Sequence, residues 1–459
     1  SNTWLVGAND TSGNANFSKV TFFKDTIPLL IDFVNPTPAN GSTTKFSTAT
    51  INVTVSENVS YCLLGWRTFS EITNITEDLR NIDIIYDIEN TSDGGYIATG
   101  YTKIDPGYQS DAVLWKINGA GETEWISTLG GAWYDEEGYA VKPVSDGYAI
   151  AGYTENDAYE KEFWLAKTDF DGNLEWSSRF GVEGYNLKAY DLETTEDGGY
   201  ILVGEGYLSR IPIAKFNSDG SLAWNMTYES GEYGKYYIKA SDIEPTSDGG
   251  YLITGDARRS EPDGRNIFMI KINSSGYAEW RKIHDRGTGS YDWSSEADED
   301  YDGGFIIAGY TGTTGPYNII SIKTNSSGDL VWNKTYGEGY SSSKGHSVKI
   351  TPDNKYILAG EAGSDAWIAK INESGSIIWN TTFNARVGWN DEPYKIIITP
   401  DGEYAIGGSI YRYFYYGYRY DMFIAKFDSE GKPASITSTS LKNMSYSCLL
   451  YTSPSPRDS

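Results

Sequence analysis

Asp197-Gly-Gly-Tyr200 is the most informative stretch of this sequence, because close variants of it recur along most of the chain. The intervals between successive copies are 53, 51, 51, 54, 51 and 48 residues. Repeats of about this length are typical of solenoids, arrays and propellers. The seven copies begin at Asp93, Asp146, Asp197, Asp248, Asp302, Asp353 and Asp401.

Two further residues recur in phase with this turn. A lysine closes a short apolar stretch after each turn, and a tryptophan follows the next glycine turn in every copy but the last. We expect the tryptophans to pack between neighbouring copies and each turn aspartate to cap its own turn. The lysines are Lys116, Lys167, Lys215, Lys271, Lys323, Lys370 and Lys426. The tryptophans are Trp125, Trp176, Trp224, Trp280, Trp332 and Trp379.

One copy reads as four short strands separated by tight turns. In the third copy, the expected strands cover 187–195, 200–204, 211–217 and 222–228. Glycine after aspartate supplies the positive-φ positions that tight hairpins need. Four antiparallel strands in about 50 residues match one propeller blade, and closure into a ring hides the exposed sheet ends. We therefore predict an all-β fold with a seven-bladed β-propeller of four-stranded blades over 80–435.

The repeats resemble a known class of sequence. Units of the form Asp-Gly-Gly-Tyr-x-x-x-Gly, then an apolar strand ending in Lys, then Gly-x-x-x-Trp, resemble the β-propeller repeats of secreted archaeal and bacterial surface proteins. More loosely, they resemble the pyrroloquinoline-quinone-type propellers. The resemblance covers about 80–435 and implies an extracellular or cell-surface protein, archaeal in style. It carries over no quinone site and no catalytic residue.

The two ends of the chain read differently from the repeats. Residues 1–27 resemble the end of an immunoglobulin-like β-sandwich, and 28–79 resemble an incomplete second such domain or a linker. Residues 62–80 fit neither pattern. Residues 436–459 form a tail, of which 448–459 read as translated sequencing-adapter DNA, so we leave them out of the fold prediction.

Composition disfavours several classes of function. A formal net charge of −26 argues against nucleic acid as a partner, because the phosphate backbone is itself anionic. No apolar run approaches the ~20 residues of a membrane-spanning helix. Two histidines and two cysteines argue against a His/Cys zinc site or a Cys–His nucleophile. We expect His284 and His346 to have structural or surface roles.

The most unusual segment, Tyr411–Tyr420, combines aromatic residues with arginine between the second and third expected strands of the last copy. Such residues are enriched at binding surfaces. We predict that this loop projects from one face and contacts a partner, and the alternative is a long hairpin whose rings pack on one another. The predicted contact residues are Tyr411, Arg412, Tyr413, Tyr415, Tyr416, Tyr418 and Arg419. Candidates for the same rim are Trp133, Tyr134, Trp293 and Trp389.

Calcium and glycan sites are also candidates. Asp298, Asp300 and Asp302 match the first half of a calcium loop, although the bidentate glutamate is missing and a solvated acidic turn is the alternative. No other cofactor is predicted. Asn-x-Ser/Thr sequons in exposed turns are glycan acceptors in secreted proteins. The candidate acceptors are Asn273, Asn325, Asn333, Asn372 and Asn380.

These features predict a non-enzymatic binding or adhesion module that presents a propeller face to a glycan or a surface protein outside the cell. One alternative is a hydrolase or lyase that acts on polysaccharide at the propeller channel, and another is a structural component of a surface layer. Acidic side chains clustered with arginine or a metal near the axis would favour the enzyme. A channel lined by backbone and small residues would favour the binding module.

Overall fold

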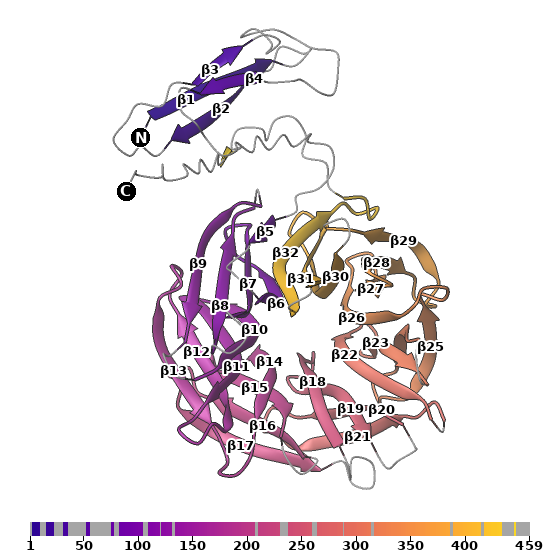
Figure 1. The fold of residues 1–459 in the computed structure, drawn as a ribbon. Coiled ribbons are helices and arrows are strands. Elements are labelled where there is room, and N and C mark those ends of the chain that lie inside the picture. Colours follow the sequence, from indigo (N-terminus) through magenta and orange to yellow (C-terminus); the bar gives the residue numbers. More distant parts are fainter. Residues whose placement is uncertain are drawn as a thin grey trace. The chain divides into compact units, whose positions relative to one another are not determined.

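The computed structural model describes residues 82–433 with short gaps (Figure 1). The gaps are 104–108, 120, 131–133, 207–209, 230–236, 259–263, 288, 314–315, 386–388 and 415–416. Only the backbone is described for 412–414, for 417–419 and for the strands outside 82–433. Within this described part, no helix has the length and apolar character needed to cross a membrane.

The chain divides into two compact units, Ser1–Ile72 with Ser435–Ser459, and Thr73–Ala434. Among the residues that the structure describes, the first unit contains three strand pairs, two antiparallel and one parallel. The immunoglobulin-like character predicted for 1–79 and the nature of the tail depend largely on residues outside those described, and both stay predictions. The pairs are β1 (Asn2–Asn9) with β2 (Ala15–Phe22), antiparallel; β2 with β33 (Ser445–Tyr446), parallel; and β3 (Ile31–Val34) with β4 (Asn52–Val55), antiparallel.

The second unit is built from repeated sets of antiparallel strands, in which each strand pairs with the next. Single residue pairs join some of these sets into larger sheets. The first strands are β6 (Ile82–Asn90), β10 (Glu136–Val144), β14 (Lys188–Thr194), β18 (Tyr237–Pro245), β22 (Tyr291–Glu299), β26 (Ser343–Ile350) and β30 (Asn390–Ile398). The second strands are β7 (Tyr96–Lys103), β11 (Gly147–Glu155), β15 (Tyr200–Glu205), β19 (Tyr251–Arg258), β23 (Phe305–Gly312), β27 (Tyr356–Ala362) and β31 (Tyr404–Phe414). The third strands are β8 (Ser110–Ile117), β12 (Lys161–Thr168), β16 (Arg210–Phe216), β20 (Asn266–Ile272), β24 (Asn318–Thr324), β28 (Asp365–Ile371) and β32 (Gly417–Phe427). The fourth strands are β9 (Thr123–Leu129), β13 (Leu174–Phe180), β17 (Leu222–Glu229), β21 (Ala278–His284), β25 (Leu330–Tyr336) and β29 (Ile377–Phe383).

The last set receives a strand from the other end of the unit. β5 (Ile75–Glu77) pairs antiparallel with β32, with Met422 opposite Glu77. This strand lies in the range 28–79, which the sequence pattern assigns to an incomplete domain or linker. The compact unit accordingly starts at Thr73, a few residues before the expected boundary. A three-residue strand is too short to show the alternation of apolar and polar residues by which a strand is recognised in a sequence.

The sets are arranged around an axis with their first strands innermost (Figure 1). Each first strand contacts the first strand of the next set, and β30 contacts β6, so the end of the unit meets its beginning. One hydrophobic cluster crosses this junction and joins Ile85, Ile88 and Trp115 to Ile397 and Met422. The described part of the unit is therefore an all-β ring of repeated antiparallel sheets.

In six of the seven repeated turns, the aspartate is held both by its own turn and by a lysine; Asp146 is held by Lys167. The Asp93 carboxylate accepts the Gly95 N–H at 3.0 Å and the Thr91 hydroxyl at 2.5 Å, as expected for an aspartate that caps its own turn. The phased lysine also pairs with this carboxylate, which explains why turn and lysine recur together. These pairs are Lys116–Asp93 at 2.8 Å, Lys167–Asp146 at 3.0 Å, Lys215–Asp197 at 2.5 Å, Lys271–Asp248 at 2.9 Å, Lys323–Asp302 at 2.9 Å, Lys370–Asp353 at 3.0 Å and Lys426–Asp401 at 2.7 Å.

The phased tryptophans pack each set onto the next. Trp176 and Tyr200 of the following set share a hydrophobic cluster, and their ring centroids are 6.0 Å apart. The glycine at the outer turn of the following set faces the indole, so that a Cβ on Gly220 would lie 2.6 Å from Trp176 Cζ3. These contacts agree with the packing role expected of the tryptophans. The other pairs are Trp125 with Gly172, Trp224 with Gly276, Trp280 with Gly328, Trp332 with Gly375 and Trp379 with Gly431.

Candidate functional site

The first strands each contain a β-bulge at the same place. In β6, the pairing with β7 shifts between Ile85 and Asp87, which leaves Tyr86 as the extra residue. A bulge bends the strand and re-aims the side chain of the extra residue. Because the first strands are innermost, these residues lie around the axis, and we call them the axial belt. Its members are Tyr86, Tyr139, Tyr190, Ser241, Ser295, His346 and Tyr394.

The aromatic members of the axial belt contact one another in series. Tyr86 stacks on Tyr139 with ring centroids 4.7 Å apart, and it meets Tyr394 edge-on at 5.2 Å. Tyr139 contacts Tyr190 at 5.0 Å. On the other side, Tyr394 contacts His346 at 5.6 Å. All five side chains are half-buried, so part of this aromatic surface remains accessible.

Trp293 and Arg265 extend the aromatic surface on the side where the axial belt has its two serines. Trp293 stacks on Tyr310 with ring centroids 4.5 Å apart. The Arg265 guanidinium lies 4.2 Å from the centroid of Tyr237 and 5.6 Å from that of Trp293. A guanidinium over an aromatic face is held by a cation–π interaction. The strands that carry the two serines, β18 and β22, therefore also carry the two rings, of Tyr237 and Trp293, that the Arg265 guanidinium faces.

Three lysines near the axial belt face tyrosine rings. The Lys239 ammonium lies 4.0 Å from the Tyr190 centroid. The ammonium groups of Lys161 and Lys188 lie 3.9 and 5.2 Å from the centroid of Tyr153. Within the part of the chain that the structure describes, none of these lysines makes an ion pair. Burial lowers the pKa of the Lys239 amine, which makes its neutral form more accessible.

The carboxylates around the axial belt, in contrast, are already engaged. Burial raises the pKa of the Tyr139 phenol, and the neighbouring Tyr86 and Glu137 raise it further, so this phenol stays protonated and donates a hydrogen bond. The site thus combines protonated phenols, partnered carboxylates and lysines without ion pairs. The carboxylate contacts are Asp256 with Arg265 at 2.6 Å, Glu137 with the Tyr139 hydroxyl at 2.7 Å, and Glu361 with Lys344 at 2.6 Å.

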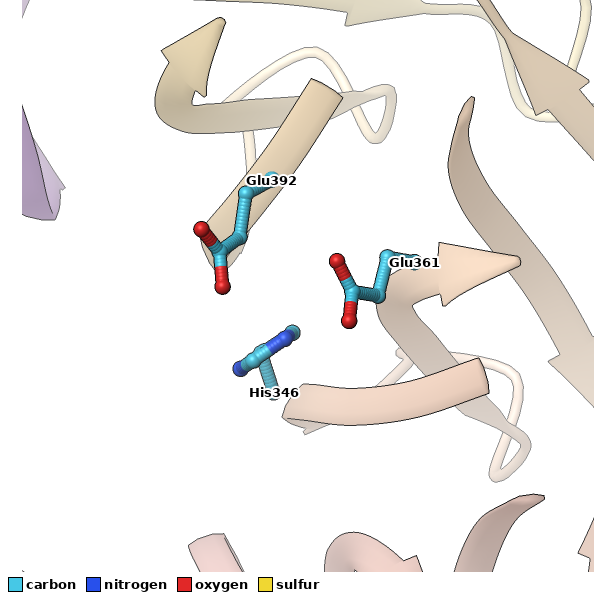
Figure 2. A group of neighbouring side chains, drawn as sticks. All are labelled: His346, Glu361 and Glu392. Atoms are coloured by element: carbon cyan, nitrogen blue, oxygen red, sulfur yellow. The ribbon is translucent and has the colours of Figure 1, made fainter. Parts of the chain in front are cut away.

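Figure 2 shows three side chains from three strands that point toward one another. His346 comes from β26, Glu361 from β27 and Glu392 from β30, and each offers one ligand atom within 4.8 Å of the other two. Burial, reinforced by Lys344, lowers the pKa of His346 to about 3, so its imidazole is neutral at physiological pH. The sequence analysis did not indicate this neighbourhood, because Glu361 lies on the next strand and Glu392 in the next set, and the structural or surface role of His346 stays a prediction.

In every set except the second, where it is Ala140, the residue after the bulge makes a side-chain contact with another set. Asp87 Oδ2 accepts the N–H of Val141 in the next set at 2.8 Å. Lys395 occupies the equivalent place in β30 and pairs with Glu296 at 2.5 Å. These contacts fix the backbone on which the belt residues stand. Equivalent bonds join Asp191 to the N–H of Ile243 at 2.8 Å, Asp242 to that of Ala297 at 3.0 Å and Glu296 to that of Val348 at 3.0 Å.

The predicted binding segment extends the hairpin of β31 and β32. Tyr411 and Tyr420 pair across the strands, and their rings stack 5.2 Å apart. This stack agrees with the packed-hairpin alternative at the base of the segment. The segment also comes near the axial belt, since burial and nearby groups that include Tyr420 raise the pKa of Tyr394. The side chains of Arg412, Tyr413, Tyr418 and Arg419, and all of Tyr415 and Tyr416, lie outside the described residues.

The three aspartates of the predicted calcium loop have protein partners. Asp298 accepts the Ile350 N–H at 2.8 Å, whereas Asp300 and Asp302 pair with Lys323 at 3.0 and 2.9 Å. Their oxygens do not lie together as the three ligand atoms at His346 do. Calcium binding stays a prediction.

The predicted glycan acceptors lie on the outer turns and strands. In Asn273, Asn325 and Asn372, the side-chain oxygen accepts the backbone N–H two residues later, at 3.0 Å in each case. Asn333 and Asn380 are exposed on β25 and β29. Glycosylation stays a prediction.

The rim residues proposed beside the loop do not form one group. Tyr134 is hydrogen-bonded to Asp157 at 2.5 Å, and Trp389 is buried. Trp293 flanks the axial belt, and Trp133 lies outside the described residues. The sequence analysis did not identify the axial belt, although the spacing of its members from the repeated turns is nearly constant. Its members stand nine or ten residues before the aromatic residue of each repeated turn.

No known protein family matches the sequence, and no curated protein matches it either. Solved structures of β-propeller-like proteins are similar in fold. An ulvan lyase from a new family of polysaccharide lyases, bound to -[GlcA(1-4)Rha3S]-, is 12% identical, with a TM-score of 0.52 over 77% of this chain and 93% of that chain. A protein from Lactobacillus plantarum is 11% identical, with a TM-score of 0.50 over 73% of this chain and 97% of that chain. A catalytically inactive virginiamycin B lyase from Staphylococcus aureus, with quinupristin, is 13% identical, with a TM-score of 0.48 over 78% of this chain and 100% of that chain. At these identities, the similarity to the ulvan lyase and to the Lactobacillus plantarum protein establishes an all-β, propeller-like repeat fold and nothing more.

Proposed function

We propose that this protein binds and cleaves an acidic polysaccharide at the axial belt. The observation that carries the proposal is a series of half-buried aromatic rings beside lysines that make no ion pair within the described residues. Aromatic faces offer apolar area for sugar rings, and the unpaired ammonium groups of Lys161 and Lys188 attract carboxylate or sulfate groups. The charge of the whole chain is −26, so an anionic polymer needs local cations of this kind.

The side chains around the axial belt favour elimination over hydrolysis. A hydrolase of the usual kind needs two carboxyl groups about 5–9.5 Å apart, one as acid and the other as base or nucleophile. Here Asp256, Glu137 and Glu361 are engaged by Arg265, Tyr139 and Lys344. Because of these partners, the three carboxyl groups are poorly placed to act as the acid and the base or nucleophile of a hydrolase.

Elimination at a uronate removes the proton from the carbon beside the carboxylate and breaks the bond from the neighbouring carbon to the glycosidic oxygen. A carbon–carbon double bond forms, and the leaving oxygen takes up a proton. The neutral amine of Lys239 is the candidate base, because burial lowers its pKa. The phenol of Tyr139 or Tyr190 is the candidate proton donor, because burial keeps both phenols protonated and Tyr190 lies against Lys239. Lys188 and Arg265 would neutralise the substrate carboxylate.

The similar ulvan lyase supports this substrate class by analogy of fold alone, since its ligand contains glucuronate and sulfated rhamnose. The test incubates the purified chain with uronate-containing and sulfated polysaccharides. Elimination yields an unsaturated sugar that absorbs in the ultraviolet, whereas hydrolysis yields reducing ends without that absorbance. Binding without either product would support the adhesion module instead.

Lys239→Met is the diagnostic variant. We expect it to lower the elimination rate by about 10²-fold or more, the usual contribution of general acid–base catalysis. Lys282→Met is the matched control, because Lys282 lies on an outer strand and pairs with Asp329 at 2.6 Å. Equal rates in the two variants, or no binding of any acidic polysaccharide by the unaltered chain, would overturn the proposal.

We also propose that the ring is a closed seven-bladed β-propeller whose last four-stranded blade is completed by β5. The contact between β30 and β6 and the cluster that joins Trp115 to Met422 support closure. Removal of 1–72 should then leave the ring folded, whereas removal of 1–80 should destabilise it. Equal unfolding midpoints for the two truncations would contradict a role of β5 in closure.

A second candidate function is adhesion through the Tyr411–Tyr420 segment, at the cell surface or outside the cell. Its support is the extended hairpin, whose base lies near the axial belt. Combined replacement of Tyr413, Tyr415, Tyr416 and Arg419 should abolish binding in a glycan array or a pull-down while the fold persists. Unchanged binding would remove the segment from the functional interpretation.

A further inference from the structure

The group in Figure 2 brings one imidazole and two carboxylates together, a set of ligand types that can bind a metal ion. One imidazole and two carboxylates, from His346, Glu361 and Glu392, offer ligand atoms that all lie within 4.8 Å of one another. The three residues come from three strands held by ladder hydrogen bonds, so their backbone positions are fixed. The β26 bulge lies between Gly345 and Ser347 and re-aims the His346 side chain.

The imidazole lacks a partner in the described part of the protein. His346 Nε2 is buried and has no hydrogen-bond partner there. A buried polar atom without a partner destabilises the folded state. Such an atom in a native structure points to an absent ion, an absent water or a functional role. A metal ion bound to this nitrogen would satisfy it.

The two carboxylates already contact a positively charged side chain. The Lys344 ammonium lies 2.6 Å from Glu361 and 4.0 Å from Glu392. Lys344 is also opposite Glu361 in the register of β26 and β27. The group is therefore arranged to bind a cation, and the ammonium would compete with a metal ion for the same oxygens.

We propose that His346, Glu361 and Glu392 bind a divalent transition-metal ion, best matched by Zn²⁺, and that Lys344 acts as its built-in competitor. Calcium and magnesium prefer all-oxygen ligands, whereas an imidazole with carboxylates suits zinc. Three protein ligands leave a coordination position open for water or a substrate oxygen, as in catalytic zinc sites. The inference goes beyond the proposed polysaccharide chemistry and does not depend on it.

Isothermal titration of the full, untagged chain with Zn²⁺ tests the inference, with no polysaccharide present. We expect one site, a loss of affinity of at least tenfold in His346→Gln and in Glu361→Gln, and a gain of at least tenfold in Lys344→Met. His284→Gln is the matched control, because the Nε2 atom of His284 is also buried without a partner but lies outside the group. Circular dichroism verifies that each variant is folded.

Two results would overturn the inference. The first is an affinity of His346→Gln equal to that of the unaltered chain, which would assign zinc to the acidic surface in general. The second is an unchanged affinity in Lys344→Met, which would show that the ammonium and the metal do not share the carboxylates. Because Zn²⁺ binding is measured without a polymer, failure of the polysaccharide proposal leaves this result interpretable, and the reverse also holds.

Discussion

Replacement of Gly220 by alanine tests how neighbouring sets of strands are held together. Gly220 stands at the outer turn between β16 and β17 with φ of 80°, and an added Cβ would lie 2.6 Å from Trp176 Cζ3 and 2.9 Å from Ser178 Oγ. Real Cβ atoms do not tolerate such distances, and the indole is rigid. Ser178 also donates a hydrogen bond to the Gly220 carbonyl at 2.6 Å, which resists movement of the turn.

Gly198 of the same set provides the matched control. Its φ is 78°, but an added Cβ there would meet nothing within 4 Å. Left-handed backbone costs a non-glycine residue about 1–2 kcal/mol, and both replacements incur that cost. Overpacking against a rigid ring costs a further 1–3 kcal/mol or so, and only Gly220→Ala incurs it.

The assay is equilibrium unfolding in urea, followed by tryptophan fluorescence and by circular dichroism. We expect Gly220→Ala to lower the free energy of unfolding by about 1–3 kcal/mol more than Gly198→Ala does. In the Trp176→Leu variant, Gly220→Ala should lower the free energy of unfolding by less than it does in the unaltered chain, since the smaller side chain makes room for the added Cβ. Equal losses at the two glycines would refute the idea that the tryptophan–glycine contact holds adjacent sets.

Three other outcomes follow from the charges and hydrogen bonds near the axis and in the turns. Lys395→Met leaves the buried Glu296 with Lys349 as its remaining cation, so we expect a loss of about 3 kcal/mol in the free energy of unfolding, measured by urea unfolding; because the lysines hold the pKa of Glu296 at about 2, below its ordinary 4.5, the loss should be the same at pH 7 and pH 5 and shrink toward pH 3, and an equal loss at pH 7 and pH 3 would contradict it. Hydrogen bonds from the phased lysine and the turn threonine hold the pKa of Asp197 at about 2, below its ordinary 3.8, so its contribution is present above about pH 4 and is lost as the pH falls toward 2; an Asp197→Asn variant should therefore show a flatter acid-unfolding profile, and an unchanged profile would count against the pairing. Ser347→Ala removes the hydroxyl that accepts the Ile396 N–H at 3.0 Å and donates to Glu296, and thermal unfolding should report a loss of about 1–3 kcal/mol, whereas a loss near zero would show that water replaces the hydroxyl.

The features that could be predicted from the sequence are local and repeated. The turn aspartate, the lysine that pairs with it and the tryptophan that meets the next glycine all recur in phase, because each repeat must make the same contacts. β5 has no such repeat, because it is three residues long and fills a place that occurs once in the ring. Its pairing with β32 joins the two ends of the unit, so only the folded structure reveals it.

The sequence pattern did not identify the axial belt, because a bulge depends on the register between two strands; the nearly constant spacing to the turn aromatic marks the belt residues only once the bulges are known. The sequence places Tyr86 next to Asp87 but does not indicate that the pairing with β7 skips Tyr86. The group at His346 is hidden for a similar reason, since Glu361 and Glu392 come from a second strand and from the next set. Residues that come together from different sets have no fixed spacing within one repeat, so a repeat pattern does not reveal them.

The residues that pack neighbouring sets together and the residues of the axial belt occupy different positions in the repeat. The belt residues can therefore differ between sets while the packing stays the same. The lysine, tryptophan and glycine contacts lie in turns and outer strands, where each repeat needs the same residue. The belt residue belongs to no ladder pair, so tyrosine, serine and histidine can alternate there without loss of pairing. The two serines, Ser241 and Ser295, are in adjacent sets, whereas the five aromatic members contact one another in series, so the belt has an aromatic side and a side with short hydroxyl side chains.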